Sequence, residues 1–354
     1  MFGLRHLLGL GLLALSVTAA PQPHKKRTCS TKCFPNGNAT ISDATATKRT
    51  RENWWCPADK MYGFMGFSYP LEVSDCGDAS NGFDKINSDF KKMKEMGASM
   101  VRVYAPECRE KSVWENLLKA GIENNMGIIG MVWWGFGDQG LWVKTRDSIN
   151  AVLEENPLAP FVFHSMAFGS EPVGDGVEDD GTFVKDMLAW KDTLSKYGIN
   201  LGISEDWDRQ GRLTDGDGLT DFGKQIRDAS DNLQLHPMPY YHCDKYPTAD
   251  NVMDYFSWYI EKLVEPNMPG LPIFVTETQW SSQQGGSHNR GCGEPGEDLD
   301  NFKKFWNTWQ DNCDYWKQHK VGWFAHTFSD EMEGGFGILD GSGNPKMDFA
   351  PPRC

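Results

Sequence analysis

The stretch PIFVTETQW, residues 272–280, places a charged residue directly after an apolar run. Pro272, Ile273, Phe274 and Val275 are typical of a buried strand, and Glu277 follows almost at once. A carboxylate beside buried apolar residues is costly unless it is paired or used in chemistry. The stretch therefore predicts a strand whose far end carries a functional group.

Seven further stretches are also short and rich in apolar, strand-forming residues, and amphipathic segments separate them. The eight predicted strands are 62–69, 99–105, 127–134, 160–169, 200–204, 233–240, 272–277 and 321–328. Between them, helices are predicted over 83–97 and near 112–125, 146–156, 182–197, 219–230, 249–264 and 298–318. Such alternation predicts an α/β fold, a (β/α)8 TIM barrel forming a single catalytic domain. A doubly wound sheet is the alternative, but it needs a glycine-rich turn after the first strand, and GFSYPLEV has none.

The first residues are expected to lie outside the barrel. Residues 1–20 have an early basic residue, a short apolar run and small residues at the end, which predicts a secretory signal peptide. The basic segment 21–27 is either a pro-segment or an exposed linker, residues 28–57 form a polar, loosely ordered lead-in that contains cysteines, and 58–354 form the barrel domain. No later stretch has the roughly 18 apolar residues of a membrane-spanning helix, and no GPI-type tail follows. We therefore expect a secreted protein of the extracellular space or cell wall.

Nine cysteines in a secreted chain predict disulfides, with at least one cysteine left over. The spacing of Cys29 and Cys33 resembles half of a zinc site, but no second pair follows at finger spacing. Asn38 begins the only N-glycosylation sequon that we find. The net charge of −14 argues against nucleic acid or an anionic membrane surface as a partner. We expect a monomer.

Carboxylates follow several of the predicted strands. In a TIM barrel the carboxyl ends of the strands meet at the face that carries catalysis. Glu171 follows the fourth strand and Glu277 the seventh, and two such groups across a cleft can cleave a glycosidic bond. The alternative for each carboxylate is a solvated strand end or a structural ion pair. The sequence has no serine-hydrolase elbow, zinc-binding histidine spacing or phosphate loop, so we expect no metal or cofactor.

The ordered motifs resemble glycoside hydrolase family 17, the fungal and plant β-1,3-glucanases and glucanosyltransferases. The motifs that carry the resemblance are MYGFMGFSYP (61–70), VRVYAPEC (101–108), GSE (169–171), HPMPYY (236–241), TETQWSS (276–282) and WFAHTFSDEME (323–333). They fall in family order over most of the mature chain, and TETQW and VRVYAPEC are the most specific.

The resemblance implies a retaining glycosidase that acts on β-glucan in the manner of a glucan endo-1,3-β-glucosidase, or a transglycosylase. Glu277 matches the nucleophile and Glu171 the general acid/base, with carboxyl groups about 5 to 5.5 Å apart. The remaining candidates would line the cleft, contact sugar hydroxyls or tune the pair. They are Tyr69, Tyr104, Ser170, Glu205, His236, Tyr240, Trp280, Phe328 and Glu331.

The chain also departs from the family pattern. Ser170 replaces an asparagine that reaches toward the sugar's 2-hydroxyl, and Gln279 replaces a glycine beside the nucleophile. Two other readings therefore stay open. One is a cell-wall glucan-binding protein with weak or lost catalysis, and the other is a hydrolase of a different β-linked glycan on the same barrel.

Overall fold

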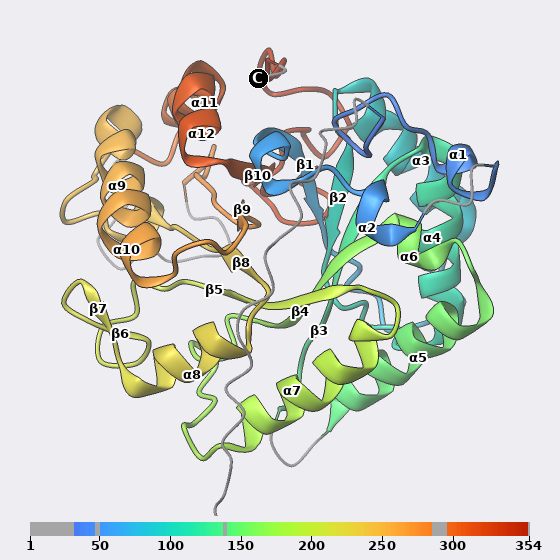
Figure 1. The fold of residues 1–354 in the computed structure, drawn as a ribbon. Helices are drawn as coiled ribbons and strands as arrows, with labels where there is room; N and C mark the ends of the chain where they lie inside the picture. The colour runs from blue at the N-terminus through green and yellow to red at the C-terminus, as the bar shows by residue number, and fades with distance from the viewer. Residues whose placement is uncertain (1–31, 47–49, 137–139, 285–295, 353–354) are drawn as a thin grey trace, which may run out of the picture. The chain divides into compact units, whose positions relative to one another are not determined.

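The computed structural model describes residues 32–46, 50–136, 140–284 and 296–352. Eight parallel strands close into a barrel in which each strand pairs with its neighbours in chain order and the last pairs with the first (Figure 1). These strands are β1 Gly63–Tyr69, β2 Met100–Val103, β3 Gly127–Val132, β4 Phe163–Ser170, β5 Asn200–Glu205, β8 Asn232–Leu235, β9 Ile273–Val275 and β10 Val321–Ala325. The predicted (β/α)8 barrel is confirmed.

Each predicted strand overlaps an observed one, and the differences lie at the ends. Residues Ala159–Val162 form a short helix, α6, where the sequence predicts the start of the fourth strand. Pro160 explains this, because proline suits the first turn of a helix and removes a donor from a strand ladder. The short β6 Thr214–Asp215 and β7 Gly218–Leu219 pair only with each other, outside the barrel.

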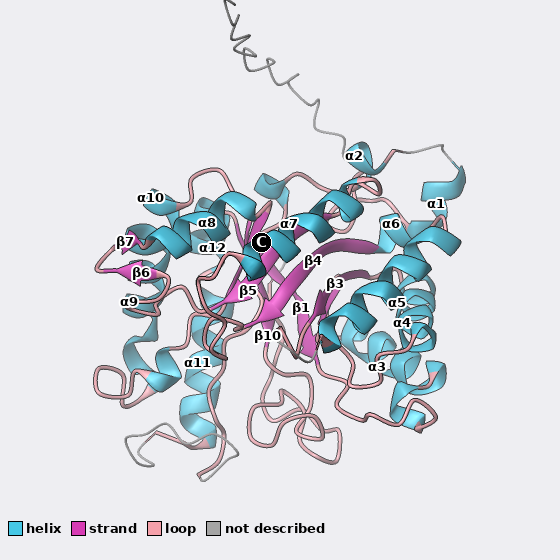
Figure 2. Cartoon of the chain, turned by 90° about the horizontal axis from the view of Figure 1, so that it is seen from below, coloured by secondary structure: helices cyan, strands magenta, loops and turns pink. Residues whose placement is uncertain are grey.

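Helices lie around the outside of the barrel strands, and Figure 2 shows the same arrangement after a quarter turn. The long helices are α3 Phe83–Glu95, α4 Lys111–Asn124, α5 Leu141–Glu155, α7 Thr182–Ser195, α8 Asp221–Ala229, α9 Val252–Trp258, α11 Leu299–Asp311 and α12 Cys313–His319. The short elements are α1 Ile41–Ala46, α2 Arg51–Trp54, η1 Ala58–Lys60, η2 Ala79–Asn81, η3 Pro239–Tyr241, η4 Ala249–Asn251, η5 Tyr259–Val264 and α10 Glu265–Asn267.

Helix α3 illustrates why these segments become helical. Its buried residues Ile86, Phe90 and Met93 recur every three or four positions and face the barrel. The helix stops before Gly97, whose positive φ of 95° suits glycine. The predicted helix 298–318 is in fact two helices, because Asn312 leaves the helical conformation between α11 and α12.

The first barrel strand needs a glycine at one position. The register between β1 and β10 shifts between Phe64 and Gly66. A Cβ on Gly66 would collide with the carbonyl oxygen of Met100 on β2, so a side chain there would push the two strands apart. Beyond this point Ser68 points into the barrel, and its hydroxyl donates at 2.9 Å to the carbonyl of Thr276, just after β9.

The polar lead-in was expected to be loosely ordered, and its described part instead packs on the barrel. Phe34 and Trp54 are buried and stacked, with ring centroids 5.1 Å apart. Trp55 lies against the start of β3 at Gly127, and the Arg51 guanidinium donates to the carbonyls of Pro160 and His164 at the start of β4. The lead-in therefore covers the end of the barrel where the strands begin.

Disulfides hold loops at both ends of the barrel. Cys33 pairs with Cys56 in the lead-in, and Cys76 pairs with Cys108 between the loops that follow β1 and β2. Cys243 and Cys313 are also disulfide-bonded. This bears out the prediction of disulfides.

The signal peptide, the basic segment and Cys29 lie outside the described residues. Asn38 of the sequon is exposed. Within the described ranges, no helix is both long enough and apolar enough to cross a membrane.

Candidate active site

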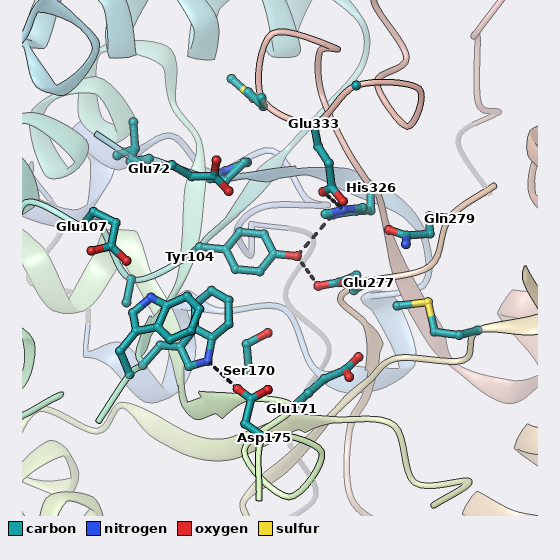
Figure 3. Close-up of a pocket in the computed structure, with 18 of the residues that line it drawn as sticks. Glu72, Tyr104, Glu107, Ser170, Glu171, Asp175, Glu277, Gln279, His326 and Glu333 are labelled. Carbon is teal, nitrogen blue, oxygen red and sulfur yellow. Dashed lines mark hydrogen bonds and ion pairs between the residues drawn. The ribbon is translucent and has the colours of Figure 1, made fainter. Parts of the chain in front are cut away.

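Glu171 and Glu277 line one cavity at the carboxyl ends of the barrel strands (Figure 3). Glu171 directly follows β4, and Glu277 lies two residues beyond β9. The cavity has a volume of about 870 Å³ and mixes carboxylates with aromatic rings. It lies at the barrel face where TIM-barrel catalysis occurs.

The backbone before Glu171 turns sharply. Gly169 has a φ of 100°, and Glu171 itself has a φ of 48°, a left-handed conformation that is uncommon for a residue with a side chain. The Glu171 amide donates to the Ser204 carbonyl of β5 at 2.8 Å, which holds the turn. Strained residues of this kind concentrate at functional sites.

The two carboxylates are close together, and His236 lies between them. One oxygen of Glu171, one oxygen of Glu277 and a ring nitrogen of His236 all lie within 4.8 Å of one another. His236 Nδ1 is 2.9 Å from Glu171 Oε1, and its Nε2 is 3.8 Å from Glu277 Oε2. Retaining glycosidases keep their carboxyl groups about 5 to 5.5 Å apart, whereas inverting enzymes need about 6.5 to 9.5 Å. The observed spacing fits the retaining arrangement.

Arg102 of β2 lies beneath the pair, with no exposed side-chain surface. Its Nη1 is 3.6 Å from Glu277 Oε2, and its Nη2 donates to the hydroxyls of Ser170 at 3.1 Å and Ser204 at 3.0 Å. The guanidinium therefore offsets the charge of Glu277 and fixes the hydroxyl of Ser170.

A chain of hydrogen bonds runs from Glu277 away from Glu171. The Tyr104 hydroxyl donates to Glu277 Oε2 and lies 3.2 Å from His326 Nδ1. His326 Nε2 lies 2.6 Å from Glu333 Oε2, as Figure 3 shows. Burial raises the pKa of Tyr104, so its hydroxyl stays protonated and able to donate. Burial acts to lower the pKa of His326, but the charges of Glu333 and Glu277 outweigh it and raise the pKa.

On the other side, Arg209 joins Glu171 to Glu205. Its Nη2 donates to Glu171 Oε2, and its Nε donates to Glu205 Oε1 at 2.7 Å. Glu205 is fully buried and also accepts from the Val173 amide at 2.8 Å. Burial raises the pKa of Glu205 to about 7, with a further contribution from the charge of Glu171.

The pKa of Glu171 is lowered in this setting. Burial acts to raise it, but the hydrogen bond and charge of His236, then the charges of Arg209 and Arg102, outweigh the burial. The unliganded site therefore favours the carboxylate form of Glu171.

Two stacked tryptophans form one wall of the cavity. The rings of Trp133 and Trp134 are 3.8 Å apart and inclined by 20°, and 38% of Trp134 is exposed. Trp133 Nε1 donates to Asp175 Oδ2 at 3.3 Å. The pair lines both this cavity and a second hollow of about 990 Å³.

The structure brings together several of the residues predicted from the sequence. Glu171, Glu277, Ser170 and Tyr104 line the cavity, and His236 and Glu205 contact Glu171 directly or through Arg209. Sequence reasoning missed Arg102, Arg209 and Asp175. The sequence could have indicated Arg102, because it lies two residues before Tyr104 and strand alternation places both side chains on the same face.

Five other predicted residues do not line the cavity. They are Tyr69, Tyr240, Trp280, Phe328 and Glu331. Strand alternation explains Tyr69: its hydroxyl donates to Asp89 of α3 at 2.7 Å, whereas its neighbour Ser68 faces inward. The other four make their contacts outside the cavity.

Three of these four are buried in the surrounding packing. Tyr240 donates to Glu297 at 2.7 Å, and its neighbour Tyr241 lines the cavity instead. Trp280 packs on Tyr240, with ring centroids 5.6 Å apart, and Phe328 packs on Phe67. The fourth, Glu331, is exposed and lies 3.6 Å from Lys85.

Glu171, His236 and Glu277 also form a group that could hold a metal ion. However, Arg209 bonds Glu171, and Arg102 lies beside Glu277. His236 Nε2 lies 2.6 Å from the Ser204 hydroxyl, and its Nδ1 is bonded to Glu171. Because these donor atoms have partners and two guanidinium charges adjoin them, the residues fit a metal poorly.

Among solved structures, the chain is similar to glycoside hydrolase barrels. A β-1,3-glucanosyltransferase of glycoside hydrolase family 17 from Rhizomucor miehei is 18% identical, with 81% of this chain and 98% of that chain covered and a TM-score of 0.61. An active-site mutant of the Rhizomucor miehei β-1,3-glucanosyltransferase, in complex with laminaritriose, has the same identity and coverage and a TM-score of 0.59.

A GH5_18 variant from Streptomyces cattleya, in complex with Manβ1-4GlcNAc, is 12% identical, with 80% of this chain and 77% of that chain covered and a TM-score of 0.56. No protein-family model matches the sequence, and no curated protein matches it. At these identities the similarity supports the barrel fold.

Proposed function

We propose that the chain is a retaining β-glycoside hydrolase or transglycosylase that acts on cell-wall β-glucan, with β-1,3-glucan favoured. The observation that carries the proposal is the spacing of Glu171 and Glu277, whose nearest oxygens lie within 4.8 Å of each other at the catalytic face of the barrel. The complex of the Rhizomucor enzyme with laminaritriose supports β-1,3-glucan as the first substrate to test.

In the first step, Glu277 attacks the anomeric carbon while protonated Glu171 gives its proton to the leaving oxygen. The glycosidic C–O bond breaks, and an ester bond forms between the sugar and Glu277. Tyr104 and Arg102 hold the attacking oxygen, because both contact Glu277 Oε2.

In the second step, Glu171 takes a proton from the incoming hydroxyl, and the oxygen of that hydroxyl replaces Glu277 on the anomeric carbon. Water gives hydrolysis, and a sugar hydroxyl gives transfer. The two hollows beside Trp133 and Trp134 offer room for a sugar acceptor.

The lowered pKa of Glu171 bears on the first step, because a general acid must start protonated. Arg209 and His236 favour the carboxylate, so the proposed enzyme works best at acidic pH. The same contacts favour a second candidate, a wall glucan-binding protein with weak or lost turnover. Ser170 also favours it, because serine is shorter than the asparagine of the family and its hydroxyl is held by Arg102.

The predicted signal peptide and the disulfides support secretion to the extracellular space or cell wall. Exposed Asn38 supports a glycoprotein. We propose that the protein acts as a monomer with no cofactor.

The test is incubation of the secreted protein with laminari-oligosaccharides, beside the Glu277→Gln variant, with products resolved by mass over time. Products shorter than the substrate indicate hydrolysis, and longer ones indicate transfer; either should vanish in Glu277→Gln. Binding without products in both proteins would favour the glucan-binding candidate. Equal products from both proteins would overturn the role of Glu277.

A further inference from the structure

Several carboxylates line the cavity and the adjoining hollow. The cavity is lined by Glu72, Glu107, Glu171, Asp175, Glu277 and Glu333. The hollow shares Trp133, Trp134 and Asp175 with it and adds Glu178, Asp180 and Asp186. Among the residues that the structure describes, no lysine or arginine lines either space.

The cations around the lining balance only part of this charge. His326 lines the cavity and pairs with Glu333 at 2.6 Å. Arg209 is shared between Glu171 and buried Glu205, and Arg109 pairs with Glu107 at 2.9 Å. Arg102 lies beside Glu277. Arg212 approaches Glu178 only to 3.8 Å, and Asp175 receives a hydrogen bond from an uncharged indole. Within the described residues, Asp175, Asp180 and Asp186 have no ion-pair partner, so the two adjoining spaces carry excess negative charge.

Gln279 supplies an independent sign that a donor group is missing. Only 2% of it is exposed, its Nε2 donates to the Tyr241 hydroxyl at 2.9 Å, and its Oε1 has no hydrogen-bond partner. The residue lines the cavity, and Figure 3 shows its amide directed toward the side where His326 and Glu277 lie. Leaving a buried acceptor unpaired costs about 1–3 kcal/mol, so a ligand that donates to Gln279 would relieve that cost.

The stacked tryptophans add a flat surface between the two spaces. An indole face attracts a nearby cation and also suits the C–H face of a sugar ring. The exposed side of Trp134, with Asp175 close to its partner Trp133, combines a ring face and a carboxylate. Both features suit a sugar that carries a positive charge.

We propose that the two adjoining spaces bind a β-glycan that carries free, protonated amino groups. This inference rests on the proposed function and names a chemical feature of the substrate or acceptor that a neutral glucan lacks. Hydroxyl groups can donate to the same oxygens, but only an ammonium group offsets the excess charge. Glycans with uronic acids are excluded by repulsion from the same carboxylates.

The first experiment compares binding to the Glu277→Gln variant of two oligosaccharides matched in length and linkage. Oligomers of β-1,4-glucosamine and of β-1,4-N-acetylglucosamine differ only at the nitrogen, which is a free amine in one and a neutral acetamide in the other. We expect the amine form to bind at least about 10-fold more tightly at low salt, as about 1.4 kcal/mol of ion pairing would give. The advantage should shrink at high salt, because exposed charges are screened. Equal binding at low salt, or an advantage that salt does not reduce, would overturn the proposal.

Substitutions outside the catalytic pair test which residues cause the preference for the glucosamine oligomer. Glu178→Gln combined with Asp186→Asn should remove several-fold of the affinity for the glucosamine oligomer and leave the acetylated oligomer unchanged. Asp192→Asn, on the same helix as Asp186 but outside both spaces, is the matched control and should change neither. Gln279→Met should weaken binding of the glucosamine oligomer about 10-fold at unchanged charge. The proposal fails if Asp192→Asn matches the double variant, or if Gln279→Met has no effect.

Activity assays separate this inference from the proposed function. Cleavage of laminari-oligosaccharides that needs Glu277, without preferential binding of glucosamine oligomers, would leave the proposed function standing and overturn the inference. Turnover of the glucosamine oligomer, or transfer onto it, that Glu277→Gln abolishes would support both. No turnover of either substrate, with salt-sensitive binding of the glucosamine oligomer, would support the inference and count against catalysis.

Discussion

The Nδ1 atom of His236 lies 2.9 Å from an oxygen of Glu171. This contact fixes the carboxylate on the side that faces Glu277 and helps to lower its pKa against the effect of burial. The group that we propose as general acid is therefore held in its ionised form. The pH dependence of turnover should therefore report the groups around Glu171.

The first prediction concerns Arg209. Because the folded pKa of Glu171 is lowered, its protonated form is lost as the pH rises through that low value, and turnover should fall with it. Arg209→Met removes one of the charges that lower this pKa, so the high-pH limb of kcat/KM should move to higher pH. The measurement is a pH–rate profile of both proteins. Arg209→Lys, which keeps a positive charge, should shift the limb less, and Arg227→Met on the outer helix α8 should not shift it. A limb that does not move in Arg209→Met would contradict the assignment.

The second prediction concerns stability and Glu205. Its pKa is raised from 4.5 to about 7, so folding favours the protonated form. The resulting penalty is absent below the unfolded pKa, grows between about pH 4.5 and pH 7, and is constant above. It amounts to about 3 kcal/mol. Glu205→Gln cannot titrate and does not incur this penalty. The unfolding free energy of the variant minus that of the native protein should therefore rise between about pH 4.5 and pH 7. A difference that is flat with pH would refute the raised pKa.

The third prediction compares two tyrosines. Tyr104→Phe removes a hydrogen bond to charged Glu277, and bonds of this kind contribute about 1.5–3 kcal/mol, so kcat should fall about 10- to 100-fold. Tyr69→Phe removes a hydrogen bond to Asp89 outside the cavity and should lower stability with kcat unchanged. Steady-state kinetics and thermal unfolding of both variants give the comparison. An equal loss of kcat in both would show that Tyr104 acts only through stability.

The fourth prediction concerns the lead-in. Its disulfide, Cys33–Cys56, lies at the end of the barrel away from the cavity and spans 23 residues. Replacing both cysteines with serine should lower the free energy of unfolding by about 2–4 kcal/mol. The kcat of the folded variant at low temperature should match that of the native protein. A selective loss of kcat without loss of stability would contradict the view that the lead-in is purely structural.

The barrel was predictable because its strands are short apolar runs that alternate with amphipathic segments. The errors have local causes, such as Pro160, which starts a helix, and Asn312, where one predicted helix becomes two. The lead-in was misjudged because its polar composition hides Phe34 and Trp54, which are buried against the barrel.

The site was predictable where a residue directly follows a strand, as Glu171 does, or lies in a specific motif, as Glu277 does. It was not predictable where the face of a strand decides whether a side chain points into the cavity. Tyr69 lies next to inward-facing Ser68 and so points outward, and nothing in the local sequence fixes that phase. Arg209 lies in a loop, and only the fold brings it to both Glu171 and Glu205.

The order in which the product anomers appear tests directly whether Glu171 and Glu277 act as a retaining pair. Proton NMR during the first minutes of laminari-oligosaccharide hydrolysis shows the anomeric form of the new reducing end before it equilibrates. We expect the β-anomer to appear first, because two displacements restore the original configuration. The α-anomer appearing first would mean a single displacement by water, and Glu277 could not then be the nucleophile.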